Sequence, residues 1–390
     1  MLVLFLSFVI IVNLVFAIKS ILYRKTYRKT SLKYDSSWTP LCAVFVPCKG
    51  VEDGMDNYLR AMLTQDYPSY RVYFITESQV DPAFSLVRKL AEEYTFASVV
   101  TAGRTEKCCQ KNHNLLAGIN IELKREDKAE VFVFADADVK PSAIWLRDLI
   151  LPMSDQKISA TTAYRWLKPE KFSFWGTMHA MLSAYLGTLM SSSKGMWGGS
   201  MAVKVDDFIK HGVKERWERA VGDDIPLMEI IVKKNLNRVF VPICTAESKN
   251  VIDKFSSLFA WFVRQNQYLK IYCRLHWLTA CVITILNTFS VIIVPLVIVA
   301  AILFPPMAEL LIPSLVYLIA MIFIMALSRF EGKEGQPYIV WVLMAYPSML
   351  MGFSTLMTSG IQKDMIWRGI RYGVNKDGTV SFVKVETENG

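Results

Sequence analysis

The stretch that decides the fold reads Glu130-Val-Phe-Val-Phe-Ala-Asp136-Ala-Asp138. Its apolar part, residues 130–135, is a short run of valine and phenylalanine that ends at charged residues, which is typical of a buried strand. The carboxyl edge of an open α/β sheet is where ligands bind. Two carboxylates there can hold a hard cation, Mg²⁺ or Mn²⁺, whose other ligands are phosphate oxygens. An Asp-x-Asp pair is also common in solvated turns, so the motif alone does not identify a metal site and the rest of the chain has to be considered.

Strands and helices alternate on the N-terminal side of this stretch. Cys42–Pro47 and Tyr70–Thr76 are rich in valine and aromatic residues and predict two more buried strands. Amphipathic stretches with apolar residues at helical spacing cover residues 55–64, 82–94 and 111–123. This alternation predicts an α/β, Rossmann-like domain with a mostly parallel sheet and right-handed crossovers, over residues 38–271.

Long apolar segments flank the predicted domain. The chain is 53% hydrophobic and 20% charged, which is too apolar for a purely soluble protein and excludes disorder. Residues 1–23 lack the features of a cleaved signal peptide and predict a retained transmembrane anchor. Three C-terminal blocks, at 278–304, 310–327 and 338–357, approach the roughly 20 residues that span a bilayer. We therefore expect an integral membrane protein with membrane segments within residues 278–358.

The net charge of +9 is concentrated beside these segments. A dense basic run follows the first apolar block, and the C-terminal tail, residues 359–390, is also basic. The positive-inside rule places both flanks and the predicted α/β domain in the cytoplasm, which explains the charge better than nucleic-acid binding does. Four crossings would separate the tail from the domain. We therefore expect one block to be re-entrant or interfacial, and the candidate is 338–357, which Pro347 and Gly352 interrupt.

Several familiar site types are missing from the sequence. Seven cysteines without any C-x-x-C indicate unpaired thiols in a reducing compartment, with no disulfide framework and no zinc ribbon. The chain has no G-x-G-x-x-G and no G-x-x-x-x-G-K, so dinucleotide-binding oxidoreductases and P-loop NTPases lose their main support. The four histidines show no metal-ligand spacing: His113, His179, His211 and His276.

Blocks along nearly the whole chain resemble the inverting, family 2-like glycosyltransferases with the GT-A fold, and in particular the ceramide glucosyltransferase group (family 21-like). In order they are PCKGVED, NYLRAMLTQDYPSYRVYFITES, QKNHNLLAGI, FADADVKPSAIWLRDLI, KGMWGGSMAV, GDDIPL, RQNQY and IWRGIRYGV. The resemblance implies transfer of a hexose from a UDP-sugar to a lipid hydroxyl, with ceramide-like acceptors favoured and with Mg²⁺ or Mn²⁺ as cofactor.

The resemblance also implies roles on the donor side. Glu52 and Glu77 would lie against the uridine, although Glu52 and its neighbour Asp53 could exchange roles. Asp136 would approach the ribose or the sugar, and Asp138 would bind the metal. Lys111 matches a block near the donor, and an ordinary lysine on a helix surface explains it equally well.

The pair Asp223-Asp224 corresponds to the acids that supply the general base. A lipid hydroxyl is a poor nucleophile near neutral pH, so a carboxylate must take its proton as the new bond forms. We expect Asp224 to be this base and Asp223 to raise its pKa by like-charge repulsion. The pair also fits a helix N-terminus, where the dipole favours acids, and the two interpretations are compatible.

On the acceptor side, we expect Trp197 to form an apolar platform and Gly199 to allow close approach of the backbone. The segment at 264–268 keeps Arg264, a candidate for the donor phosphate. It has Gln267 and Tyr268 where the family has arginine and tryptophan, which weakens phosphate neutralisation and the acceptor wall. In the tail, the arginines and aromatic residues of 367–372 fit an interfacial belt better than a cover over the donor.

Three alternatives stay open. A transferase acting on a polyprenyl phosphate, a hopanoid or another lipid would use similar chemistry. A processive polysaccharide synthase shares the fold, but it is expected to have an unaltered motif at 264–268 and more membrane-spanning segments. A catalytically silent membrane scaffold would not need the clustered acids Asp136, Asp138 and Asp224.

Overall fold

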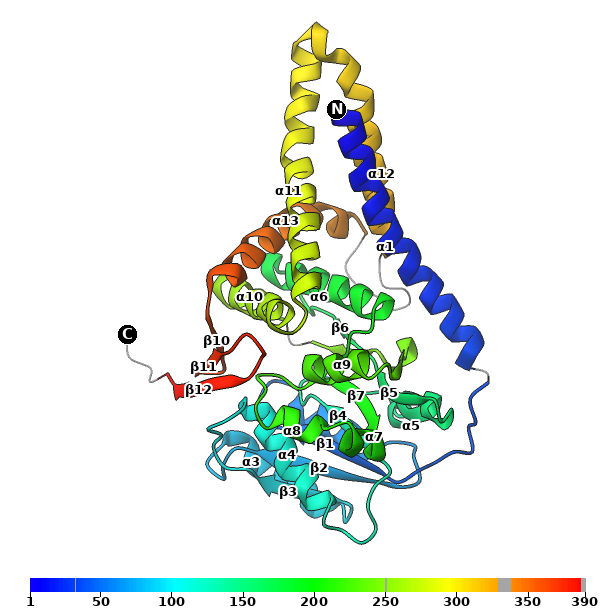
Figure 1. Ribbon diagram of the computed structural model, residues 1–390, viewed down its shortest axis with the longest axis vertical. Helices are drawn as coiled ribbons and strands as arrows, with labels where there is room; N and C mark the ends of the chain where they lie inside the picture. The colour runs from blue at the N-terminus through cyan, green and yellow to red at the C-terminus, as the bar shows by residue number, and fades with distance from the viewer. Residues whose placement is uncertain (32, 250, 329–337, 387–390) are drawn as a thin grey trace. The chain divides into compact units, whose positions relative to one another are not determined.

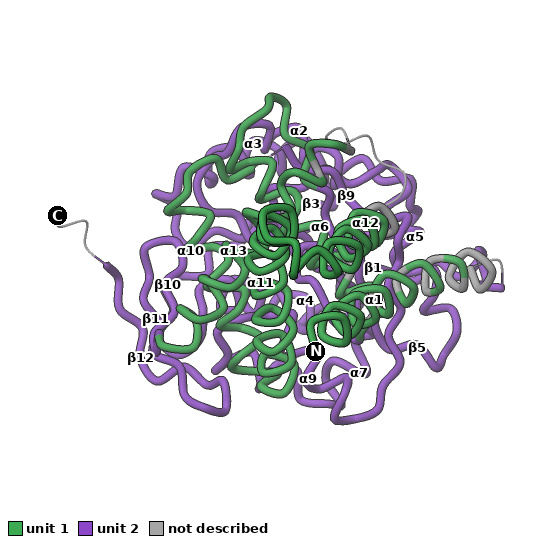
Figure 2. The backbone as a smooth tube through the Cα atoms, turned by 90° about the horizontal axis from the view of Figure 1, so that it is seen from above, with its two compact units in different colours: residues 1–26, 167–193, 251–361 green, residues 27–166, 194–250, 362–390 purple. Residues whose placement is uncertain are grey.

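The computed structural model describes residues 1–31, 33–249, 251–328 and 338–386. The polar loop after the second C-terminal apolar block, residues 329–333, lies outside them. The chain forms two compact units, which are coloured separately in Figure 2. Unit 1 contains residues 1–26, 167–193 and 251–361, and unit 2 contains residues 27–166, 194–250 and 362–390. Each unit is described by itself below.

Within the described residues, unit 2 is built on a seven-stranded sheet with the order β3-β2-β1-β4-β7-β5-β8 (Figure 1). Its strands are β1 (Cys42–Pro47), β2 (Tyr70–Thr76), β3 (Ala97–Thr101), β4 (Val131–Ala135), β5 (Ile158–Thr162), β7 (Ser200–Lys204) and β8 (Asn237–Phe240). β1 lies parallel to β2 and β4, and only β7 runs antiparallel to its neighbours, β4 and β5. The predicted α/β class and mostly parallel sheet are confirmed.

Helices cover both faces of this sheet because its strands are apolar on both sides. On one face, Val44 and Val46 of β1 pack in a core with α2 (Met55–Leu63), α3 (Pro82–Glu93) and α5 (Trp145–Ile150). On the other face, Ala43 and Phe45 pack with a second group of helices. That group is α4 (Gln110–Glu122), α7 (Val205–Lys210), α8 (Val213–Trp217) and α9 (Asp224–Lys233). The carboxyl ends of β1, β2 and β4 therefore meet at one edge, as the sequence predicts.

The basic C-terminal tail, predicted over residues 359–390, belongs to unit 2 from residue 362 onward and is folded in its described part. It forms an antiparallel three-stranded sheet of β10 (Asp364–Trp367), β11 (Ile370–Val374) and β12 (Val380–Val385). The sheet is anchored by a hydrogen bond from the Val380 N–H to the Arg219 carbonyl at 2.7 Å. Met365, Ile370 and Tyr372 are almost completely buried, so the tail loses apolar surface to this unit rather than to a membrane interface.

Unit 1 is helical in its described part. It contains α1 (Leu2–Ser31) up to residue 26, α6 (Phe174–Ser192), α10 (Phe255–Tyr272), α11 (Arg274–Leu303), the short 3₁₀ helix η3 (Pro305–Leu310), α12 (Leu311–Ser328) and α13 (Tyr338–Ile361). Among the described residues, three segments are long and apolar enough to cross a membrane: Leu2–Lys19, Arg274–Leu303 and Pro305–Ile324. One is N-terminal and two are C-terminal, whereas the sequence predicts about three C-terminal segments. The block at 338–357 forms α13, which is not one of the three.

The predicted continuous domain over residues 38–271 is interrupted. After β6 (Arg165–Leu167), which pairs with β9 (Ala246–Ser248), the chain enters α6 and returns at residue 194. Residues 251–271 also belong to unit 1. The physical reason is that α6 and α10 bury Met178, Leu182 and Trp261 in one apolar cluster with Met344 of α13. Sequence composition alone does not reveal this pairing, because each helix keeps enough polar residues to resemble part of a soluble domain.

The division into units also bears on the number of membrane crossings. Unit 2 contains chain from before residue 167 and after residue 361. Because a folded unit lies on one side of a bilayer, any crossings between residues 251 and 361 would come in an even number. Crossings by α11 and α12 satisfy this condition without α13.

Candidate active site

Three elements of unit 2 meet at Lys111, near the N-terminus of α4. The Lys111 Nζ lies 2.8 Å from Oδ1 of Asp136, which follows β4, and 3.0 Å from Oδ2 of Asp223, which precedes α9. The side chains of Lys111 and Asp223 are only 12% and 7% exposed. The alternative of an ordinary surface lysine is therefore wrong: Lys111 is the cation at the centre of an acidic cluster.

The charges of Lys111 and Asp136 stabilise each other. Burial opposes the charge on Lys111, but the carboxylates of Asp136 and Asp223 outweigh it and raise the lysine pKa well above its ordinary value. Burial likewise opposes the charge on Asp136, and Lys111 outweighs it, so that the pKa of Asp136 is lowered. Both groups are therefore charged at neutral pH.

Asp224 is the first residue of α9 and has a different environment. Its Oδ2 accepts a hydrogen bond from the Gly198 N–H at 3.1 Å, and its Oδ1 accepts one from the Ile225 N–H at 2.7 Å. Burial and then the neighbouring charge of Asp223 raise the pKa of Asp224 to about 7, against the opposing effect of Lys111. A carboxyl group with this pKa can accept a proton near neutral pH. Asp224 is thus both a helix N-terminal acid and a candidate base.

The segment 197–199 passes directly between these acids. A Cβ at Gly198 would lie 2.1 Å from Oδ2 of Asp223, so only glycine fits there without displacing the carboxylate. The Gly199 carbonyl accepts a hydrogen bond from the Asp136 N–H at 3.2 Å, and the Trp197 ring covers Gly199. The structure therefore brings Trp197 and Gly199 to the acidic cluster, while their predicted contact with an acceptor stays a prediction.

Asp138 has an arginine partner that sequence reasoning missed. Arg165, at the start of β6, places Nη1 3.1 Å from Oδ2 of Asp138, and its guanidinium lies 5.9 Å from the ring centroid of Trp197. Burial raises the pKa of Asp138, and Arg165 opposes that effect. Arg165 is a single arginine within an apolar stretch, and no spacing in the sequence connects it with Asp138.

The other oxygen of Asp138 fits a metal ion. Asp138 Oδ1 is buried and accepts no hydrogen bond from the described residues. The described part of the chain also contains no group of three or more His, Cys, Asp or Glu side chains that could hold a metal ion. At this position the described residues therefore offer one hard oxygen rather than a complete set of ligands. This suits Mg²⁺ or Mn²⁺, which can take their remaining ligands from phosphates and water.

The predicted uridine-binding acids lie in the loops after β1 and β2. Glu77 is 3.5 Å from the Lys49 Nζ and 3.2 Å from the Arg104 Nε. Oε1 of Glu52 accepts a hydrogen bond from Nη2 of Arg368 at 3.0 Å. Both acids are thus in ion pairs at the carboxyl edge of the sheet, and their contact with a nucleotide stays a prediction.

A search against protein families finds a match over residues 6–380 with glycosyl transferase family 21. The chain belongs to glycosyl transferase family 21. This confirms the resemblance read from the sequence blocks, and with it the GT-A-type α/β catalytic unit.

Solved structures similar to this family 21 chain include mannosyltransferase PcManGT from Pyrobaculum calidifontis in complex with GDP-Man and Mn²⁺. It is 16% identical, with a TM-score of 0.46, and the match covers 90% of this chain and 99% of that one. GalNAc-T7 with UDP, GalNAc and Mn²⁺ is 12% identical, with a TM-score of 0.40 and coverage of 60% and 49%. A mycobacterial protein is 14% identical, with a TM-score of 0.40 and coverage of 60% and 75%.

Three predicted site residues of this family 21 protein belong to unit 1. Arg264, Gln267 and Tyr268 lie on α10, and Gln267 is only 4% exposed. Their roles at the donor phosphate and the acceptor wall stay predictions.

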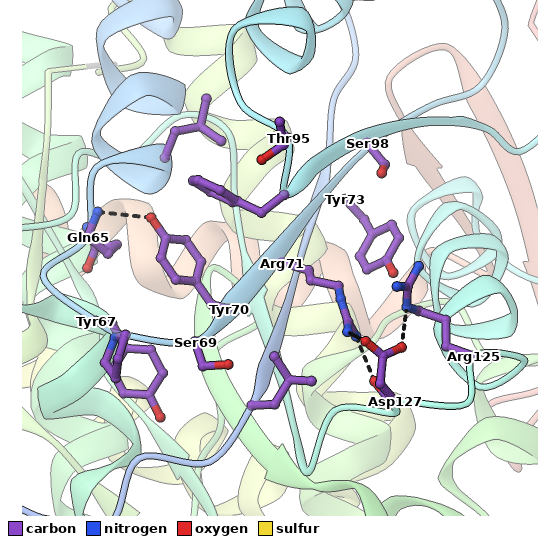
Figure 3. A pocket seen from close by; sticks show the side chains of 14 residues that line it. Gln65, Tyr67, Ser69, Tyr70, Arg71, Tyr73, Thr95, Ser98, Arg125 and Asp127 are labelled. Carbon is purple, nitrogen blue, oxygen red and sulfur yellow. Dashed lines mark hydrogen bonds and ion pairs between the residues drawn. The ribbon is translucent and has the colours of Figure 1, made fainter.

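An open hollow of about 650 Å³ lies at the opposite edge of the sheet, where β2 begins (Figure 3). Arg71 and Arg125 on its wall both pair with Asp127. Arg71 also bonds to the buried Glu122 at 2.9 Å, and Glu122 accepts a hydrogen bond from the Tyr73 hydroxyl at 2.5 Å. These contacts satisfy the buried carboxylate of Glu122, so the charged residues of this hollow stabilise the fold.

Proposed function

We propose that this family 21 glycosyltransferase moves a hexose from a UDP-sugar to a lipid hydroxyl, with inversion at the anomeric carbon and with ceramide-like lipids as the favoured acceptors. The observation that carries the proposal is Asp224, a carboxyl group with a pKa of about 7 that is held by two backbone N–H groups beside the Asp136–Lys111 pair. A base of this kind is what activation of an alcohol requires.

In the proposed reaction, Asp224 takes the proton of the acceptor hydroxyl while the hydroxyl oxygen forms a bond to C1 of the sugar. The bond between C1 and the UDP oxygen breaks, and UDP leaves with the electron pair. One displacement without a covalent enzyme intermediate inverts the configuration at C1. Asp223 keeps the pKa of Asp224 high, and Lys111 holds Asp136 in its charged form.

Asp138 would hold the divalent cation through its free oxygen Oδ1. When bound, such a cation supplies Lewis-acid stabilisation of the departing diphosphate. Arg165 fixes the other oxygen of Asp138 and so orients the carboxylate.

The apolar helices support a lipid acceptor. The same chain carries this catalytic unit and three segments able to cross a membrane. An acceptor dissolved in the bilayer can reach an enzyme that is fixed to it, whereas a water-soluble acceptor gives no physical reason for this combination.

The test is to incubate the detergent-solubilised full chain with single UDP-sugars, Mg²⁺ or Mn²⁺ and a total lipid extract, followed by mass spectrometry. We expect a new lipid mass increased by one hexose, with ceramides as the main acceptors. Products on a polyprenyl phosphate or hopanoid would revise the acceptor, and a long polymer would favour a processive synthase. No product with any donor would favour a silent scaffold.

The metal role of Asp138 gives a separate prediction. Asp138→Asn should weaken Mn²⁺ binding in the presence of UDP by at least about tenfold, since even an outer partner of a metal ligand is commonly worth that much. Titration of free Mn²⁺ by electron paramagnetic resonance measures the affinity without any turnover. The matched control is Asp127→Asn, which changes an arginine-paired aspartate at the other edge of the sheet. Equal Mn²⁺ affinity in wild type and Asp138→Asn would contradict the assignment.

A further inference from the structure

The turn between β10 and β11 carries an arginine to the loop after β1. Trp367 and Ile370 pair across the hairpin, so Arg368 and Gly369 form a two-residue loop. Both have positive φ, 48° and 75°, as a type I′ turn requires. Asparagine or glycine adopts this conformation more readily than arginine does. A strained position occupied by arginine calls for an explanation from its side chain.

The Arg368 side chain reaches the candidate donor loop. Its Nη1 donates to the Lys49 carbonyl at 2.8 Å, and its Nη2 donates to Oε1 of Glu52 at 3.0 Å. The side chains of Arg368 and Glu52 are 45% and 40% exposed. An ion pair this exposed adds little to stability, so a purely structural role explains the strained turn poorly.

The same sheet is fixed to the rest of the acidic cluster. The Tyr372 hydroxyl of β11 accepts a hydrogen bond from the N–H of Gln110, the residue before Lys111, at 3.2 Å. Thr379 forms a β-bridge with Ala220, just before the Asp223-Asp224 pair. The tail therefore holds its turn in register with α4 and with the start of α9.

The local charges favour an anionic ligand for Arg368. A nucleotide diphosphate that enters beside Asp136 and Asp138 needs cations. Lys111 is buried between two carboxylates, and Arg165 is 12% exposed and bound to Asp138. The charge of Arg368 reaches both Asp136 and Asp138. A guanidinium has five N–H donors, and the bonds to Lys49 and Glu52 use Nη1 and Nη2 once each, so donors are left for phosphate oxygens.

We propose that the C-terminal three-stranded sheet completes the donor site and that Arg368 binds the diphosphate of the nucleotide-sugar. Glu52 and the Lys49 carbonyl orient the guanidinium, and the turn fixes its distance from the loop after β1. This inference rests on the proposed UDP-sugar donor and adds a donor-binding residue to it. It also replaces the interfacial belt that the sequence favours for residues 367–372.

The experiment compares the binding of UDP and uridine to the detergent-solubilised full chain by calorimetry in Mg²⁺. We expect Arg368→Gly to weaken UDP binding by about 10- to 100-fold, the range for a lost charge-assisted contact, and to change uridine binding by less than about threefold. Arg368→Lys, which keeps the charge but not the fork, should lie between wild type and Arg368→Gly.

Arg368→Gly also separates binding from folding. Glycine suits the positive φ, so the melting temperature should stay close to that of wild type, whereas a structural clamp would lose stability. The matched control is Arg371→Ala in the same sheet, where the arginine pairs with Glu386 and Asp364. It should leave UDP affinity unchanged.

Two results would overturn the inference alone: wild-type UDP affinity in Arg368→Gly, or equal losses for UDP and uridine. A wild-type chain that binds no UDP would overturn the proposed donor together with this inference.

Discussion

Asp224→Asn is expected to lower kcat about 1000-fold or more while the affinity for UDP stays within about threefold of wild type. The asparagine keeps the shape of the side chain and can still accept a hydrogen bond from the Gly198 N–H. It cannot take a proton from the acceptor. Turnover with the identified lipid and calorimetric binding of UDP measure the two effects separately. A parallel loss of UDP binding would mean that Asp224 belongs to the donor site.

The matched control is Asp206→Asn. Asp206 is an exposed acid in the first turn of α7, as Asp224 is an acid in the first turn of α9. If Asp224 only interacted favourably with the helix dipole, each substitution would cost about 0.3–1 kcal/mol of stability and neither would change turnover. We expect loss of turnover from Asp224→Asn and wild-type turnover from Asp206→Asn.

The pH profile of kcat/KM should report the same group. Because the pKa of Asp224 is raised to about 7, the base is protonated at pH 6 and ionised at pH 8, so the rate should rise with pH through a midpoint near 7. Asp223→Asn removes the like charge that raises this pKa, and the midpoint should move to lower pH. A midpoint near 4 in the wild type would show that Asp224 is not perturbed as described.

The fold is predictable from the sequence where local pattern and tertiary environment agree. β1 and β2 occupy the predicted residues, Cys42–Pro47 and Tyr70–Thr76, because runs of valine and aromatic residues fit only a sheet that is covered on both faces. The tail is different. β10 and β12 bury few residues, and the place of the sheet in unit 2 depends on partners of β11 and β12 such as Gln110 and Arg219, which are more than 140 positions away in the chain.

The residues of the candidate site also differ in how far the sequence predicts them. Asp136, Asp138 and Asp224 are recognisable because acids follow a buried strand or begin a helix. Arg165 is not recognisable, because an arginine has the same sequence signature whether it faces solvent or a carboxylate. Arg368 lies in a block that matches the family, but the sequence favours an interfacial belt for it. Lys111 is intermediate: its block matches the family, but only its distances of 2.8 Å to Asp136 and 3.0 Å to Asp223 distinguish a central cation from a surface residue.

Lys111→Met is expected to destabilise the catalytic unit by about 3–5 kcal/mol and to abolish transfer. Methionine fills a similar volume but leaves the buried Asp223 and the partly buried Asp136 without their shared cation, and an uncompensated buried charge costs this much. The ion pair between Lys111 and Asp136 stabilises the fold while Asp136 is ionised. Asp136 is ionised at every pH above the ordinary pKa of an aspartate. The stability difference between wild type and Lys111→Met should therefore be full at pH 7 and shrink as the pH falls below about 4.

Thermal melting of the detergent-solubilised chain across this pH range measures the effect, with Lys107→Met as the matched control. Lys107 is exposed just before α4, so its substitution should change stability by no more than about 0.5 kcal/mol. Adding Asp223→Asn to Lys111→Met removes one of the two unpaired carboxylates and should restore part of the lost stability. A single variant as stable as wild type, or a double variant that loses the sum of both effects, would contradict a central role for Lys111 in the acidic cluster.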